Sequence, residues 1–150
     1  MSLLRTIIYK NGRKQVGNAK SQVLSFKAEK RKFETAARHA LREVGQLVTK
    51  TMKEGIKNPP KTGRIYRYKG RKHQASAEGQ YPANRSGTLR RSVFYRVESW
   101  RKLTVGAEAE YAIFLEENLN RPFLHLSLEK TKKQVRNIFK KRLDQEVKGG

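Results

Sequence analysis

The spacing of apolar residues predicts a helix at residues 28–55. Apolar side chains recur there at steps of three and four, so they share one helical face while charged side chains cover the rest. We expect that face to be core. Gly55 and the following Asn58-Pro59-Pro60 predict the end of the helix, because proline cannot continue it. The apolar face consists of Phe33, Ala37, Ala40, Leu41, Val44, Leu47 and Val48.

A second long helix is predicted at residues 124–147. Lysine and arginine side chains cover its polar side, and Ser127 is the expected N-cap residue. Its apolar face again follows the helical period. That face consists of Leu124, Leu128, Val135, Ile138, Phe139 and Leu143.

Two short strands are predicted between these helices. Apolar and polar residues alternate over residues 89–97, as in a half-buried strand, and again over residues 102–107. The connection Ser99-Trp100-Arg101 is short, so the two strands should form an antiparallel pair. The helical spacing of Tyr111, Phe114 and Leu115 then predicts a short helix at residues 109–117.

The segments 1–27 and 57–88 have no sustained helical pattern. Residues 57–88 are rich in glycine, proline and basic residues, and loops of that length are usually functional or disordered. A short strand or ribbon fits around Tyr66 and Tyr68. In the first segment Asn11-Gly12 is a strong turn signal, so a short hairpin and a flexible basic arm both fit.

The order of these elements predicts an α+β fold: a small antiparallel sheet packed against two long helices, with a long basic loop and an extended N-terminal arm. Residues 1–27 form the basic extended arm or hairpin. Residues 28–150 form a single α+β domain, which is an ordinary domain size.

The charge of the chain suggests its partners. Lysine and arginine total 35 against 13 acidic residues, a formal net charge of +22. Such self-repulsion destabilises a chain unless negative charge lies nearby, on nucleic acid, an anionic membrane or an acidic protein. The excess is uneven, because residues 57–88 hold 8 bases and 1 acid whereas residues 89–120 hold 5 of each.

Several classes of chemistry lack the residues they need. The chain has no cysteine, and its 3 histidines share no metal-ligand spacing, so we expect no metal site and no cofactor. Neither a phosphate-binding glycine loop with its lysine nor a Gly-x-Ser-x-Gly motif is present, so we expect no enzyme. The apolar runs are too short for a membrane helix or a signal peptide.

Two interpretations fit the charged groups that remain. Tyrosines alternate with bases around Tyr66 and Tyr68, as in surfaces that contact nucleic acid without reading its sequence. The same basic loop could instead dock on an acidic neighbouring subunit. The acidic residues Glu108, Glu110, Glu116 and Glu117 are expected to form salt bridges to basic groups, within or between subunits.

Two motifs give the chain a family resemblance. The first, between residues 76 and 93, comprises Gly79, Pro82, Ala83, Ser86, Gly87, Leu89 and Ser92. The second comprises Tyr111, Ala112, Glu116, Arg121, Pro122 and Phe123. In this order, over about residues 30–147, they resemble the tail-completion, or minor tail component, proteins of long-tailed bacteriophages. The chain departs from the family pattern at residues 117–119 and at Leu126.

The resemblance implies a structural virion protein of the head–tail neck, assembled in the host cytoplasm. It implies a homo-oligomeric ring, with a hexamer expected from the usual symmetry of tails, that joins the tail to the portal-connector complex and lets DNA pass. The expected partners are connector or adaptor proteins, tail terminator or tail-tube proteins, and viral DNA in non-specific contact, with no membrane. The alternative is a non-specific nucleic-acid-binding protein of ribosomal or chromatin type.

The residues expected at a subunit interface or on DNA come from the basic loop, the first predicted strand and the second motif. They are Arg64, Arg67, Lys69, Arg71, Lys72, Tyr81, Arg85, Arg90, Arg91, Glu116, Arg121 and Phe123. In the second motif, Arg121 and Pro122 should set the start of the last helix, with Phe123 as its apolar anchor.

Overall fold

The computed structural model describes residues 5–10, 13–83 and 85–149, with side chains from residue 27 onward. It has the α+β fold that the sequence predicts. The elements are β1 (Arg5–Lys10), β2 (Arg13–Asn18), α1 (Ala19–Lys57), β3 (Ile65–Tyr68), β4 (Arg71–Gln74), α2 (Thr88–Ser92), β5 (Val93–Ser99), β6 (Lys102–Ala107), the π-helical turn η1 (Phe114–Asn118) and α3 (Phe123–Lys148).

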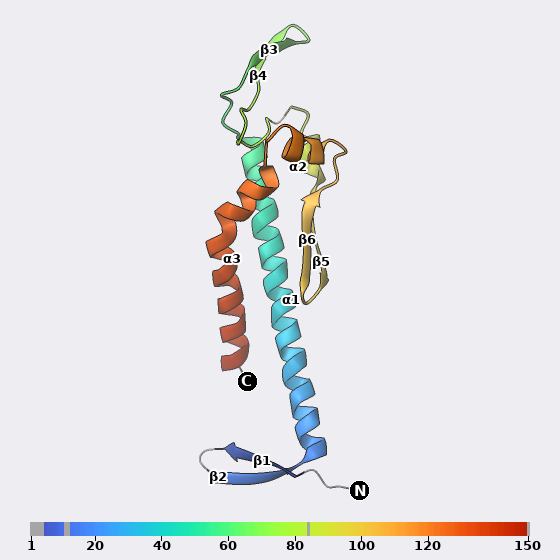
Figure 1. The fold of residues 1–150 in the computed structure, drawn as a ribbon, viewed down its shortest axis with the longest axis vertical. Coiled ribbons are helices and arrows are strands. Elements are labelled where there is room, and N and C mark those ends of the chain that lie inside the picture. The colour runs from blue at the N-terminus through green and yellow to red at the C-terminus, as the bar shows by residue number, and fades with distance from the viewer. Residues whose placement is uncertain (1–4, 11–12, 84, 150) are drawn as a thin grey trace.

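Helix α1 is the axis of an elongated molecule (Figure 1). Helix α3 runs antiparallel along one flank of α1, and the antiparallel pair β5–β6 lies along the other flank. The pair β1–β2 lies at the N-terminal end of α1, and the hairpin β3–β4 projects beyond its C-terminal end. The strands form separate two-stranded sheets rather than one small sheet.

Helix α1 is longer than its apolar pattern predicts. The predicted start at residue 28 is wrong, because the helix begins at Ala19. Residues 19–27 contain no glycine or proline, and adding residues to an existing helix is easier than starting one. Before them β1 and β2 pair antiparallel, which fits the hairpin alternative, while Asn11-Gly12 lies outside the described residues.

The buried face of α1 forms the middle of the core. Its C-terminal half contributes a row of buried apolar side chains at helical spacing. The predicted face ends at Val48, and the structure continues the row beyond it through Met52 and Ile56. Phe33 is the exception, since it remains 47% exposed and packs edge-on against Trp100, with ring centroids 5.8 Å apart. The core cluster comprises Val44, Val48, Met52, Ile56, Tyr81, Leu89, Val93, Ala112 and Phe123.

The strand predicted from residue 89 begins later. Residues 88–92 form α2, which starts after Gly87 in the left-handed region at φ 76°. Leu89 and Val93 are four residues apart, a spacing that fits one helical face as well as alternation, so the pattern was ambiguous there. The antiparallel pairing of β5 with β6 is confirmed, with Tyr95 opposite Val105.

Helix α3 begins one residue before its predicted start, but Ser127 is not its N-cap. Pro122 occupies that position, and Ser127 lies inside the helix, where its hydroxyl donates to the Phe123 carbonyl oxygen at 2.6 Å. The same hydroxyl lies 2.9 Å from the buried Tyr81 hydroxyl. An ion pair between Arg142 and Glu43 joins α3 to α1.

Gly45 allows α1 and the β5–β6 pair to approach closely. A Cβ atom built at this position would overlap the Tyr95 ring.

We therefore expect the Gly45→Ala variant to be less stable by about 1–3 kcal/mol, because the β5–β6 pair must move away from α1. The higher helix propensity of alanine offsets only part of this loss. Urea unfolding would measure the loss. Lys53→Ala, on the exposed face of α1, is the control and should change stability by less than about 0.5 kcal/mol. Equal stability of the two variants would contradict this packing.

Candidate functional site: a basic, tyrosine-lined groove

The hairpin β3–β4 is a short, exposed projection built around a tight turn. Lys69 and Gly70 form the two-residue connection, with φ values of 48° and 73°. Positive φ at both positions is the geometry that matches the twist of a two-residue hairpin, and glycine adopts it without strain. The backbone ladder continues below the strands, where the Gly63 amide donates to the Ala75 carbonyl oxygen at 2.9 Å.

The two faces of this hairpin differ. Tyr66 pairs with His73 and Tyr68 pairs with Arg71, so these side chains share one face, with the Tyr66 and His73 rings stacked at 5.7 Å. Arg67 pairs with Lys72 on the opposite face. The tyrosine face is thus an aromatic surface, and the other face is basic.

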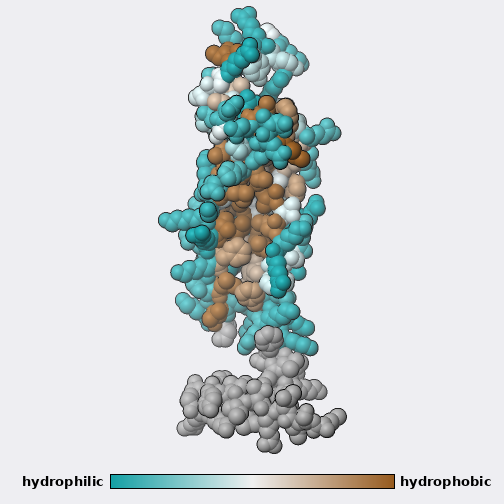
Figure 2. All heavy atoms as spheres, in the orientation of Figure 1, coloured by the Kyte–Doolittle hydropathy of each residue, from teal (hydrophilic) through white to brown (hydrophobic). Residues whose placement is uncertain are grey.

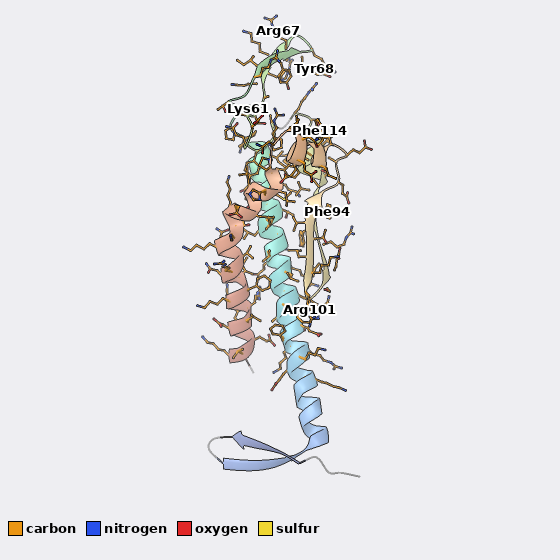
Figure 3. All side chains as sticks on the ribbon, viewed as in Figure 1. Lys61, Arg67, Tyr68, Phe94, Arg101 and Phe114 are labelled. Carbon is orange, nitrogen blue, oxygen red and sulfur yellow. The ribbon has the colours of Figure 1, made fainter. Side chains whose placement is uncertain are left out.

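A groove of about 1000 Å³ lies below the hairpin. Segments that are far apart in the sequence form it: the end of α1, the hairpin, residues 82–89 and the segment 111–121. Figure 3 shows Tyr68 on the hairpin above Phe114 in η1, at the same end of the molecule. The residues that line the groove are Ile56, Arg64, Tyr66, Tyr68, Lys69, Ala75, Pro82, Ala83, Arg85, Ser86, Gly87, Leu89, Tyr111, Leu115 and Arg121.

Positive charge and aromatic rings dominate the groove. The Arg85 guanidinium carbon lies 3.4 Å from the centre of the Tyr68 ring, a close cation–π contact that holds both side chains at the rim. Arg121 is half-buried and donates from Nη2 to the Ser76 carbonyl oxygen at 3.1 Å. Among the described residues that line the groove, none is acidic. The groove is therefore suited to a negatively charged partner that also offers an apolar or aromatic group.

The structure brings together only part of the predicted contact set. Four of the predicted cations line the groove: Arg64, Lys69, Arg85 and Arg121. Three more are exposed on the same hairpin, outside that lining: Arg67, Arg71 and Lys72. Arg90 and Arg91 lie on α2, and Arg90 faces a separate shallow depression beside α1.

Tyr81 and Phe123 lie in the core rather than on a surface. They are only 4% and 3% exposed, so neither offers a contact face to a partner. Tyr81 packs beside α1, where a Cβ atom at Gly55 would overlap its ring, and it is joined to α3 through Ser127. The expectation that Phe123 anchors the last helix is confirmed. Their positions in the sequence could not distinguish buried side chains from exposed ones, because burial depends on tertiary packing.

Glu116 caps helix α3. Its carboxylate accepts the Leu124 amide at 3.1 Å and the His125 amide at 3.0 Å, two of the donors that a helix start leaves without partners. A negative charge there also complements the helix dipole. Glu108, Glu110, Glu116 and Glu117 form no salt bridge with any residue that the structure describes, so the expected pairing within the chain is absent from that part of it.

The sequence interpretation missed several groove residues. The spacing predicts a helix at residues 109–117 with Tyr111, Phe114 and Leu115 on one face; the structure has the π-helical turn η1 there, and only Tyr111 and Leu115 line the groove, while Phe114 is exposed. Ser86 and Ala83 were noted as motif positions rather than as a groove wall. No sequence pattern within these segments indicates that they lie beside the β3–β4 hairpin in the folded chain.

The described residues contain no cluster of three or more histidine or acidic side chains arranged to hold a metal ion. In the described part of the chain no helix has the length and apolar character needed to cross a membrane. His73 packs against Tyr66, whereas His39 and His125 are exposed.

Comparison of the chain with protein-family models, with curated proteins and with solved structures found no match.

The capping role of Glu116 is testable with its neighbour as the control. Glu116→Ala removes the acceptor of two amides in the first turn of α3, so we expect a loss of about 0.5–2 kcal/mol in the free energy of unfolding. Glu117→Ala alters an exposed carboxylate and should cost less than about 0.5 kcal/mol. Urea unfolding measures both, and equal losses would show that Glu116 does not cap the helix.

Proposed function

We propose that this chain is a structural subunit of the head–tail neck of a long-tailed bacteriophage. In this proposal copies of the chain form a ring that joins the tail to the portal-connector complex and lets DNA pass. Its basic side chains contact negatively charged neighbours: acidic protein surfaces in the neck and the phosphates of the passing DNA.

The observation that carries this proposal is an apolar surface that the chain does not cover by itself. Helix α1 lies between α3 and β5–β6 in a single row, so the row has two open faces (Figure 1). Figure 2 shows a continuous apolar band running along one of these faces, between polar flanks. Leu128 and Val147 of α3 are exposed, and Val135 and Phe139 are half-buried. A contiguous exposed apolar band between polar flanks often marks an interaction surface, and contact with other subunits would bury it.

The position of the motif residues supports the choice of the phage neck. The two motifs that carry the resemblance lie about twenty residues apart in the sequence. Several of their members line one groove at one end of the molecule: Pro82, Ala83, Ser86, Gly87, Leu89, Tyr111 and Arg121. If these residues form one recognition surface, that would explain why both motifs are present in the same chain.

The charge distribution supports a role beside DNA. The hairpin β3–β4 and its base carry Arg64, Arg67, Lys69, Arg71 and Lys72, and no acidic residue occurs between residues 55 and 77. Arginine and lysine on a projecting hairpin can approach phosphates without reading bases. Sequence-independent contact of this kind suits a channel through which a whole genome moves.

Virions provide the direct test. We expect purified particles of the phage to contain the chain at the neck, detected by mass spectrometry and by antibody labelling in electron micrographs. Particles assembled without it should be full heads and separate tails, because the joint is missing. Supplying the chain to such heads and tails in vitro should restore joined particles. Infectious, intact particles that lack the chain would contradict the proposal.

A nucleic-acid-binding protein is the second candidate, and the tyrosine face of the groove favours it. The two candidates differ in how the isolated chain binds DNA. For a neck subunit we expect weak non-specific binding, with a Kd of about 10⁻⁴ to 10⁻⁶ M at physiological salt, that weakens steeply as salt rises. Fluorescence anisotropy with a labelled duplex, measured between about 50 and 200 mM salt, gives the Kd and its dependence on salt concentration. Nanomolar binding by the monomer at physiological salt would favour the second candidate.

A further inference from the structure

Residues 110–117, which include most of η1, expose apolar and acidic side chains that are not part of the groove lining. Tyr111 and Leu115 line the groove, whereas Ile113 and Phe114 are 69% and 52% exposed. The exposed acids Glu110 and Glu117 flank this pair in the sequence, Glu110 in the turn before it and Glu117 within the π-helical turn. We call Glu110, Ile113, Phe114 and Glu117 the η1 knob.

The η1 knob lacks partners in the described part of its own chain. No salt bridge to a described residue involves Glu110 or Glu117. No basic residue occurs between residues 103 and 120, so this stretch is acidic in an otherwise basic chain. Two adjacent large apolar side chains flanked by carboxylates form a surface that is suited to an apolar pocket with a basic rim.

The groove has the complementary composition. Its lining includes the apolar side chains of Ile56, Leu89 and Leu115 and the four cations Arg64, Lys69, Arg85 and Arg121. A groove of about 1000 Å³ is as large as sites that hold drug-sized ligands, so it has room for a phenylalanine and an isoleucine side chain together. The apolar groups would meet the apolar lining while the carboxylates reach the cations.

We propose that the η1 knob of one copy inserts into the groove of the next copy. This inference rests on the proposed function, since it names the contact that would build the ring. One short segment carries both the lining residues Tyr111 and Leu115 and the knob residues between and beside them, which lie outside that lining, so the proposed contact joins two molecules. Such a contact joins two different surfaces, and repeated contacts of this type close into rings when the rotation fits.

A second copy explains more of the surface than nucleic acid does. A phosphate backbone in the groove would neutralise the groove cations but leave Ile113 and Phe114 exposed. It would also bring negative charge close to Glu110 and Glu117. The knob of a second copy buries the apolar pair and matches the charges in one contact.

The absence of cysteine makes a clean cross-linking test available. One variant carries Ser86→Cys in the groove wall, and another carries Asn118→Cys beside the η1 knob, with the knob itself unchanged. The two full-length chains, tagged to differ in mass, are mixed with a short bis-maleimide. We expect covalent dimers that contain one chain of each kind, and no more than background from either variant alone.

Charge reversal tests the pairing of the surfaces. In the same mixture, Glu117→Arg in the Asn118→Cys chain or Arg85→Glu in the Ser86→Cys chain should lower the dimer yield at least tenfold. The two reversals together should restore it, because the ion pair returns with opposite polarity. Glu129→Arg, an exposed reversal on α3, is the matched control and should leave the yield unchanged. Circular dichroism confirms that each variant is folded.

The outcomes separate this contact from the neck function. Absence of mixed dimers at high protein concentration and low salt would overturn the contact, as would dimers formed by the Asn118→Cys chain alone. DNA binding that depends on Arg85, with no mixed dimers, would assign the groove to nucleic acid and also overturn it. The virion experiment is independent, because a neck ring could be built through other surfaces, and mixed dimers could form in a protein absent from virions.

Discussion

The close packing of α1 against its two flanks determines the rest of the structure. Small buried residues on α1, including Ala36, Ala40 and Gly45, let neighbouring elements approach its backbone, and the Tyr95 ring occupies the space that a larger residue at Gly45 would need. Because α1 is a single rod with one element on each side, the body has open faces that the chain alone does not cover.

These open faces link stability to assembly. A chain with a formal charge of +22 repels itself, and an elongated shape spreads that charge while leaving apolar surface in water. Contact with negatively charged neighbours would reduce the charge repulsion, and contact with other subunits would bury the exposed apolar surface. The proposed neck ring provides both at once, which is why charge and shape lead to the same class of function.

The groove depends on tertiary contacts at the end of α1. The Gly79 amide donates to the Asn120 carbonyl oxygen at 2.7 Å, and Arg121 donates to the Ser76 carbonyl oxygen. These bonds hold the segment before the groove wall against the segment that leads into α3. Glu116 then fixes the start of that helix, so the η1 knob and the groove have a defined relation within one molecule.

The sequence by itself determined the elements whose signal is local. The two long helices follow from an apolar period sustained over many turns, and the β5–β6 pair follows from alternation around a short connection. Only the tertiary structure decided which of the predicted contact side chains are exposed and which belong to the core. Tyr81 belongs to the basic loop and Phe123 to the second motif, and both segments contain exposed residues, yet packing in the core buries these two side chains. The groove was equally beyond the sequence, because Tyr68, Arg85 and Arg121 meet only after the chain has folded, and no local pattern encodes a distance between distant segments.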